Sequence, residues 1–325
     1  MPLRDLILDT LAREARAEQV APRWEALRIR PRAFARLLAL EDCASDLLVR
    51  LDALAITDRV PAPLLGLVQR RARRERAHML AMRIQLRALL DAFRDRGISV
   101  TLLKGAAFLD TGLRPYRACM DIDIAPAARD LEAAVDVLRA LGYVARAGTG
   151  LPADHHHLPP FDREGAVPVE VHTRLLGGAT APVLDEAVTR EIAPGVRVLT
   201  PTEWCWHAIA HDAQHPISFG RVHTALDVGA LVDAYGMEID WATIAGRAAR
   251  SPHRVEPQIA SAQRLGYGLP LAVSGRTQAV VTGLGVARDA LAHVGRNGVL
   301  FGWGTRKLGV AASVLLGPGA QILTN

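Results

Sequence analysis

Lysine is almost absent from this chain. Only Lys104 and Lys307 occur among its 39 basic residues, so arginine supplies nearly all of the positive charge. A lysine is a compact point charge suited to phosphate oxygens, whereas an arginine is a planar fork. In this composition the pair Lys104-Gly105 stands out. We consider two interpretations for Lys104: a contact with phosphate, or an ordinary charge at the end of a strand.

Cysteine and long apolar runs are also scarce. The three cysteines, Cys43, Cys119 and Cys205, are widely spaced and odd in number, which is typical of buried thiols in a reducing compartment. No stretch reaches the roughly 18 uncharged apolar residues that a membrane helix needs. Residues 1–13 carry charges throughout, unlike a secretory signal peptide. We therefore expect a cytoplasmic protein that makes no membrane contact.

Aromatic residues make up only 5% of the 325 residues, but half of the chain is apolar. That composition indicates a globular protein, long enough for two or three compact units. The net charge of +5 is modest and does not by itself demand a nucleic acid partner. The basic stretch 70–76 is either a solvated helix face or a surface for RNA or another polyanion. No aromatic residues are interleaved with it, which slightly disfavours RNA.

The hydrophobic pattern divides the chain into three regions: 1–96, 97–178 and 179–325. Leucines recur at helical spacing in the first region, where Pro61 and Pro63 separate two helices. A long helix is predicted from about residue 64 to 96, ended by Gly97.

The middle region reads as alternating strands and helices. Strands are predicted at 98–104, 119–125 and 167–172, with a short helix from residue 105 and an amphipathic helix at 131–141. The third region is again helical, with helix starts at Thr200-Pro201 and Asp240-Trp241 and a helix at about 221–235. Further apolar helices are predicted within 291–316.

Two carboxylates stand two residues apart in the strand at 119–125. Successive side chains of a strand point to opposite faces, so Asp121 and Asp123 share one face while Ile122 and Ile124 share the other. Like charges held together raise each other's pKa unless a cation lies between them. Mg²⁺ is often held by one or two carboxylates together with substrate phosphates. An exposed strand face without metal is the simpler alternative.

Four elements in order resemble polymerase-β-type nucleotidyltransferases. They are Leu103-Lys104-Gly105, Arg117, Asp121-Ile122-Asp123 and Glu170-Val171-His172, and they are most similar to a bacterial branch whose pattern begins with Leu-Lys-Gly. The similarity covers about residues 64–250 and includes His211, Asp227 and Asp240-Trp241. It implies an α+β fold, in which a small mixed β-sheet core is flanked by N-terminal and C-terminal helical regions.

The resemblance also implies a reaction: transfer of a nucleoside monophosphate from an NTP to an acceptor hydroxyl, with release of pyrophosphate. Asp121 and Asp123 would hold two Mg²⁺ or Mn²⁺ ions, and Glu170 would complete the second site and help to activate the acceptor. Ala106 departs from the family, which has glycine or serine there, so Lys104 would take over part of the phosphate contact. Residues that would bind the nucleotide are Lys104, Gly105, Ala106, Arg117 and His172.

Several alternatives remain open. Glu170 and His172 also fit an ordinary half-exposed strand, and Arg117 could bridge phosphates or pin the carboxylates. His155-His156-His157 is read as a loop near the active site rather than a metal site, because three adjacent side chains of a regular strand cannot face one ion. His207 and His211 are expected to pack against the core.

The acceptor could be a small molecule, a peptide or protein side chain, or an RNA end. A catalytically silent nucleotide-binding regulator or antitoxin-like protein, and a tailoring enzyme of a peptide or metabolite biosynthetic cluster, are the alternative functions.

Overall fold

The computed structural model describes residues 3–148, 155–176, 188–214, 220–252, 254–275, 277–278 and 281. The apolar helices predicted within 291–316 lie outside these residues. The helices are α1 (Leu3–Leu11), α2 (Ala17–Glu25), α3 (Pro31–Glu41), α4 (Ala44–Ala53), α5 (Ala62–Asp95), α6 (Lys104–Thr111), α7 (Leu131–Ala140), α8 (Pro201–Ala213), α9 (Val222–Tyr235), α10 (Trp241–Arg250) and α11 (Glu256–Arg264). The strands are β1 (Val100–Leu102), β2 (Ile122–Pro126), β3 (Val144–Ala145), β4 (Phe161–Asp162), β5 (Val169–Val171), β6 (Thr189–Ala193) and β7 (Val196–Leu199).

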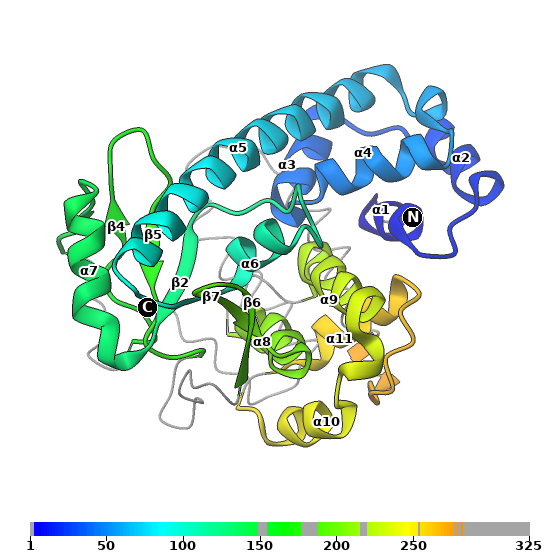
Figure 1. The fold of residues 1–325 in the computed structure, drawn as a ribbon. Coiled ribbons are helices and arrows are strands. Elements are labelled where there is room, and N and C mark those ends of the chain that lie inside the picture. Colours follow the sequence, from blue (N-terminus) through cyan, green and yellow to red (C-terminus); the bar gives the residue numbers. More distant parts are fainter. Residues whose placement is uncertain are drawn as a thin grey trace.

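The strands form one mixed sheet in the order β3-β4-β5-β2-β1-β7-β6. Strand β2 pairs antiparallel with β1 and parallel with β5, and β1 pairs parallel with β7 on its other side. Helices flank this sheet, so the predicted α+β class with a small mixed sheet is confirmed (Figure 1).

The sheet extends beyond residue 178, the boundary that the sequence suggested for the core. Strands β6 and β7 belong to the sheet, although the sequence pattern placed them in the C-terminal helical region. They form a hairpin around Gly195, whose φ of +73° lies in the left-handed region that favours glycine. Strand β7 has its parallel partner β1 almost a hundred residues back in the chain.

The long helix α5 ties the N-terminal helices to the sheet. It covers 34 residues, begins after Pro61 and is followed by Gly97, which has a φ of +67°. Figure 1 shows it running from α3 and α4 across to α7 and the edge of the sheet. Its buried residues recur every three, four or seven positions, as on one face of a helix: Leu64, Val68, Ala72, Met79, Met82, Leu86, Leu89 and Phe93.

A buried ion pair between two N-terminal helices also binds the start of a C-terminal helix. Arg4 of α1 donates to Glu41 of α3 at 3.0 Å, and both side chains are almost fully buried. Glu41 also accepts from the backbone N–H of Val222, the first residue of α9, at 2.8 Å. These contacts satisfy the buried carboxylate and fix the start of α9 beside α3.

The C-terminal helices begin where the sequence predicts. Pro201 is the first residue of α8, and Asp240 caps α10 by accepting from the backbone N–H of Thr243 at 3.1 Å. Trp204 of α8 packs against Phe108 of α6, with ring centroids 4.9 Å apart, so α8 covers the helix that follows β1. Among the described residues, none of the helices has the length and apolar character needed to cross a membrane.

Candidate functional site

The candidate site lies where β2 and β5 run side by side. The parallel register sets Asp123 opposite Glu170, with Ile122 opposite Val169 and Ile124 opposite Val171. These four apolar side chains are fully buried, so alternation directs the two acidic residues to the other face of the sheet. Asp121 lies one residue before β2.

Asp123 is fully buried and contacts the side chains of Lys104 and His172. Its Oδ1 lies 2.8 Å from Lys104 Nζ and 2.8 Å from His172 Nε2. Burial by itself would raise the pKa of Asp123, but Lys104 and the hydrogen bond from His172 outweigh it and hold the pKa well below its usual range. Within the described part of the chain, Asp123 Oδ2 has no hydrogen-bond partner although it is buried. A buried carboxylate oxygen of this kind usually has a partner.

The other two carboxylates resist ionisation. Burial, followed by the negative charge of Asp123, raises the pKa of Asp121 to about 6 and that of Glu170 to about 7. Glu170 Oε2 lies 3.8 Å from Lys104 Nζ, and its pKa stays high in spite of that contact. A cation placed among these groups would relieve the repulsion. The orphaned Asp123 Oδ2 and the hard oxygen donors around it therefore fit a divalent ion such as Mg²⁺ or Mn²⁺.

Histidines surround the Glu170 side of the site. His172 is fully buried, and its Nε2 lies 3.8 Å from Glu170 Oε2. His157 reaches the same oxygen with its Nε2 at 3.6 Å, while its Nδ1 hydrogen-bonds the Leu158 carbonyl at 2.6 Å. Potential ligand atoms of Asp123, Glu170 and His172 all lie within 4.8 Å of one another. His172 thus completes a mixed oxygen and nitrogen cluster.

The loop His155-His156-His157 lies beside this cluster, next to His172. It is not a regular strand, and one ring nitrogen from each of its three histidines lies within 4.8 Å of the others. The geometric objection drawn from a regular strand therefore does not apply to this segment.

The turn after β1 has an unusual backbone. Lys104, the first residue of α6, has a φ of +45°, which non-glycine residues rarely adopt, and this conformation brings its ammonium to Asp123. A Cβ added at Gly105 would lie 2.5 Å from Cys119 Sγ and 2.8 Å from an Arg117 nitrogen, so only glycine fits there. Ala106 is fully buried, so a side chain at this position faces the protein interior.

Arg117 pairs with Asp227 of α9. Its Nε donates to both oxygens of Asp227 at 2.9 Å, and its Nη2 lies 2.9 Å from Oδ2. Arg114 donates to the same carboxylate and to Asp46 of α4. Burial would lower the pKa of Arg117, but the Asp227 carboxylate raises it well above its ordinary value. We call Arg114, Arg117 and Asp227 the arginine clamp.

Sequence reasoning missed Arg114. Its ion-pair partner, Asp227, lies 113 residues further along the chain. Nothing in the local sequence distinguishes this arginine from its neighbours.

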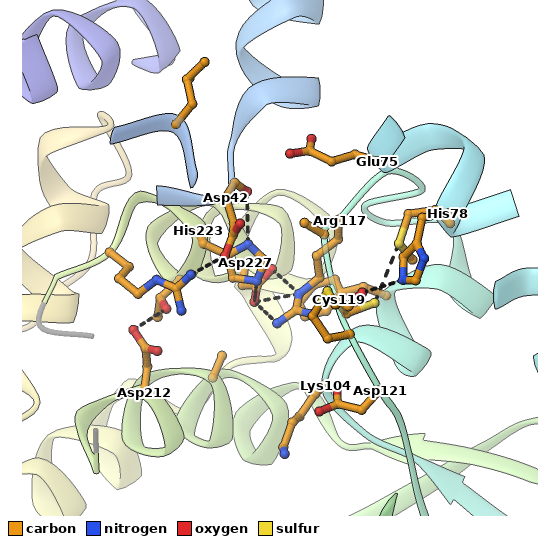
Figure 2. Close-up of a pocket in the computed structure, with 18 of the residues that line it drawn as sticks. Asp42, Glu75, His78, Lys104, Arg117, Cys119, Asp121, Asp212, His223 and Asp227 are labelled. Carbon is orange, nitrogen blue, oxygen red and sulfur yellow. Dashed lines mark hydrogen bonds and ion pairs between the residues drawn. The ribbon is translucent and has the colours of Figure 1, made fainter. Parts of the chain in front are cut away.

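A pocket of about 560 Å³ opens onto Asp121 and Asp123. Figure 2 shows Lys104 and Asp121 at one end, Arg117 in the middle, and Asp42 with Glu75 at the other end. Its walls come from α3, α5, α6, α8 and α9 together with the segment before β2. His207 and His211 of α8 line it, with ring centroids 5.6 Å apart. Its volume is in the range of small-molecule sites.

Residues 28–256 match a family described as "Uncharacterised nucleotidyltransferase". The chain belongs to this family. The match spans most of the chain and contains all three carboxylates, so the resemblance inferred from the sequence motifs is confirmed.

Two solved structures of the antibiotic-resistance factor ANT(2″)-Ia are similar to part of the chain. The solution structure is 14% identical and covers 53% of this chain and 92% of its own, with a TM-score of 0.40. The crystal structure, described as a complex with adenylyl-2″-tobramycin, is 13% identical and covers 51% and 98%, also with a TM-score of 0.40. Such a distant similarity says nothing about the substrate of this family member. No curated protein matches the chain.

Proposed function

We propose that this nucleotidyltransferase family member moves a nucleoside monophosphate from an NTP to an acceptor hydroxyl and releases pyrophosphate. The observation that carries the proposal is the convergence of Asp123 and Glu170, on adjacent strands, with Lys104 at the start of α6. Asp121 adjoins this group and opens into the same pocket as Lys104. We expect the nucleotide and the acceptor to occupy this pocket beside Asp121 and Asp123.

Asp121, Asp123 and Glu170 would hold Mg²⁺ or Mn²⁺. When bound, the metal supplies positive charge that neutralises the phosphate oxygens of an in-line displacement. Two ions are expected from the resemblance to the superfamily. Their binding would also remove the repulsion that keeps the pKa values of Asp121 and Glu170 high.

The chain's own residues suggest how the triphosphate is bound. Lys104 Nζ is a buried point charge, and the first backbone N–H groups of α6 follow it directly. Helix N-termini of this kind attract phosphate. We expect Gly105 and Ala106 to contribute backbone rather than side-chain contacts, since Gly105 has no side chain and Ala106 is buried.

We expect Glu170 to receive the acceptor's proton. Once the metal removes the repulsion from Asp123, Glu170 would be ionised, as a general base must be. The acceptor oxygen forms a bond to the α-phosphorus while the bond from that phosphorus to the bridging oxygen breaks. The electron pair leaves with pyrophosphate, and the hydroxyl proton passes to Glu170. His172 would act as a positioning residue, because its Nε2 lies 2.8 Å from Asp123 Oδ1.

The decisive experiment incubates the chain with α-labelled NTPs, Mg²⁺ or Mn²⁺ and a panel of hydroxyl-bearing acceptors. Wild type should transfer label and release pyrophosphate, whereas the double variant Asp121→Ala/Asp123→Ala should do neither. Asp136→Ala, an exposed carboxylate on α7, is the matched control and should behave as wild type. Equal labelling by wild type and the double variant would refute the metal-site assignment. Nucleotide binding without pyrophosphate release for any acceptor would favour the silent regulator.

A further inference from the structure

One face of α5 forms a wall of the pocket. Some of the charged side chains around it have ion-pair partners, and others have none among the described residues. The residues of α5 that line the pocket recur at helical spacing. They are Leu67, Arg70, Arg71, Arg74, Glu75, His78 and Met79. His78 contacts the segment before β2, since its Nε2 lies 3.0 Å from the carbonyl oxygen of Cys119, two residues before Asp121.

The acidic groups at this end of the pocket are already neutralised by partners inside the protein. Asp42 accepts from Arg71 at 2.7 Å and also pairs with Arg221. Glu75 accepts from the hydroxyl of Ser45 at 2.8 Å and lies 2.9 Å from Arg71 Nε. Deeper in the pocket, Arg114 and Arg117 of the arginine clamp pair with the Asp227 carboxylate. These carboxylates therefore leave little negative charge for a cationic ligand.

Arg70 and Arg74 are different. Neither has an ion-pair or hydrogen-bond partner among the residues that the structure describes, and both are exposed. They lie one helical turn apart, about 6 Å along the axis. A Cβ added at Gly66, one turn earlier, would lie 3.2 Å from Arg70 Nη1, so the Arg70 side chain extends back over a position that has no side chain. Two arginines on successive turns of one helix face suit a phosphate or carboxylate group.

The distances along α5 indicate which part of a ligand would reach them. Arg74 lies one turn, and Arg70 two turns, before His78, which is roughly 6 and 12 Å along the helix axis. Because His78 contacts the segment that leads into Asp121, a ligand held by both arginines would extend well away from the carboxylates. Lys104, by contrast, is in direct contact with Asp123, where the triphosphate is expected.

We propose that Arg70 and Arg74 bind an anionic group of the acceptor, so that the acceptor is a hydroxyl compound carrying a phosphate or carboxylate and not a polycation. The statement that the bound molecule is the acceptor rests on the proposed function. The anion site itself does not depend on turnover. The same helix provides a matched control. Arg73 is exposed on α5 but does not line the pocket.

The test compares wild type, Arg70→Gln/Arg74→Gln and Arg73→Gln in the full chain. Binding of glycerol 3-phosphate, inorganic phosphate and acetate is followed by NMR titration without metal, at about 0.1 M ionic strength, where charges are screened beyond roughly 10 Å. Thermal unfolding confirms that all three proteins are folded. A fluorescent ATP analogue with Mg²⁺ measures nucleotide affinity separately.

We expect the double variant to bind the phosphate probes at least tenfold more weakly, with Arg73→Gln unchanged and ATP-analogue affinity within twofold of wild type. Acetate should also bind to the wild type and lose affinity in the double variant, as expected if the site accepts carboxylates. Equal binding of the phosphate probes by all three proteins would overturn the anion site. A parallel loss of ATP-analogue affinity would overturn the acceptor assignment, since the arginines would then contact the triphosphate.

Labelling reactions separate the two proposals. With glycerol 3-phosphate, ribose 5-phosphate and their unphosphorylated forms as acceptors, wild type should label the phosphorylated members at least tenfold faster. Preferential labelling of a polycationic acceptor would refute the inference while supporting the proposed function. Loss of phosphate binding in the double variant, with no label transferred by wild type to any acceptor, would refute the transfer reaction and leave the anion site in place.

Discussion

The arginine clamp makes a quantitative prediction about stability. Replacing Asp227 by asparagine keeps the shape of the side chain but removes the charge that faces the buried Arg114 and the largely buried Arg117. Breaking a buried ion pair by removing one partner costs about 3–5 kcal/mol, because the other charge is left buried and uncompensated. Asparagine retains one oxygen acceptor, and Arg114 keeps Asp46, so we expect the lower end, about 3 kcal/mol.

The measurement is urea unfolding followed by tryptophan fluorescence, with linear extrapolation to water. Asp136→Asn is the control, since Asp136 forms an exposed pair with Arg139 three residues later and should cost less than about 0.5 kcal/mol. A cost below about 1 kcal/mol for Asp227→Asn would refute the claim that the clamp is held by a buried charge.

The stability difference between wild type and Asp227→Asn should also depend on pH. Burial would raise the pKa of Asp227, but Arg117 and then Arg114 outweigh it and hold the pKa below its ordinary value of about 4. For a depressed carboxylate, the stabilisation is complete above the unfolded pKa and is lost as the pH falls toward the folded pKa. The difference in unfolding free energy between wild type and Asp227→Asn should therefore be constant from pH 7 to 5 and shrink below pH 4. A difference that grows on acidification would contradict this sign.

Three further outcomes follow from the site. Gly105→Ala should lower the thermal unfolding midpoint and abolish label transfer, because its Cβ would overlap Cys119 and Arg117; wild-type behaviour would show that this segment moves freely. His172→Leu should reduce label transfer at least tenfold and His172→Gln less, since only glutamine can still donate to Asp123; equal effects would argue against a positioning role. In a thermal shift assay, Mn²⁺ at a hundredfold excess over its Kd should stabilise wild type by about 2.7 kcal/mol, which raises the unfolding midpoint by roughly 5 °C. The double variant Asp121→Ala/Asp123→Ala should show no such shift. The same shift in both proteins would place the metal elsewhere.

Local patterns predicted the elements that local interactions determine. Gly97 follows α5 as expected, and it has a positive φ. The alternation around Asp123 and Glu170 correctly assigned apolar residues to the core, because one face of each strand is buried and the period of a strand is two.

Features that depend on distant partners were not predictable in the same way. Strands β6 and β7 carry arginines and glutamate, and they are recognised as strands only once β1 provides the parallel neighbour. Lys104 could be linked to phosphate by its residue type, but its contact with Asp123 depends on a backbone conformation that the sequence does not reveal. The arginine clamp joins α9 to the segment before β2, across more than a hundred residues.

The parallel pairing of β1 with β7 has a consequence for how the protein is made. Val100 lies opposite Val196, so β1 lacks one neighbour until the ribosome has added almost a hundred more residues. At about 5–20 residues per second, this takes roughly 5–20 s. Throughout that interval the nascent chain presents an apolar strand edge, which is a template for wrong pairing. A chaperone that binds extended apolar segments during synthesis should therefore raise the yield of native protein, and translation that pauses before residue 199 should lower it.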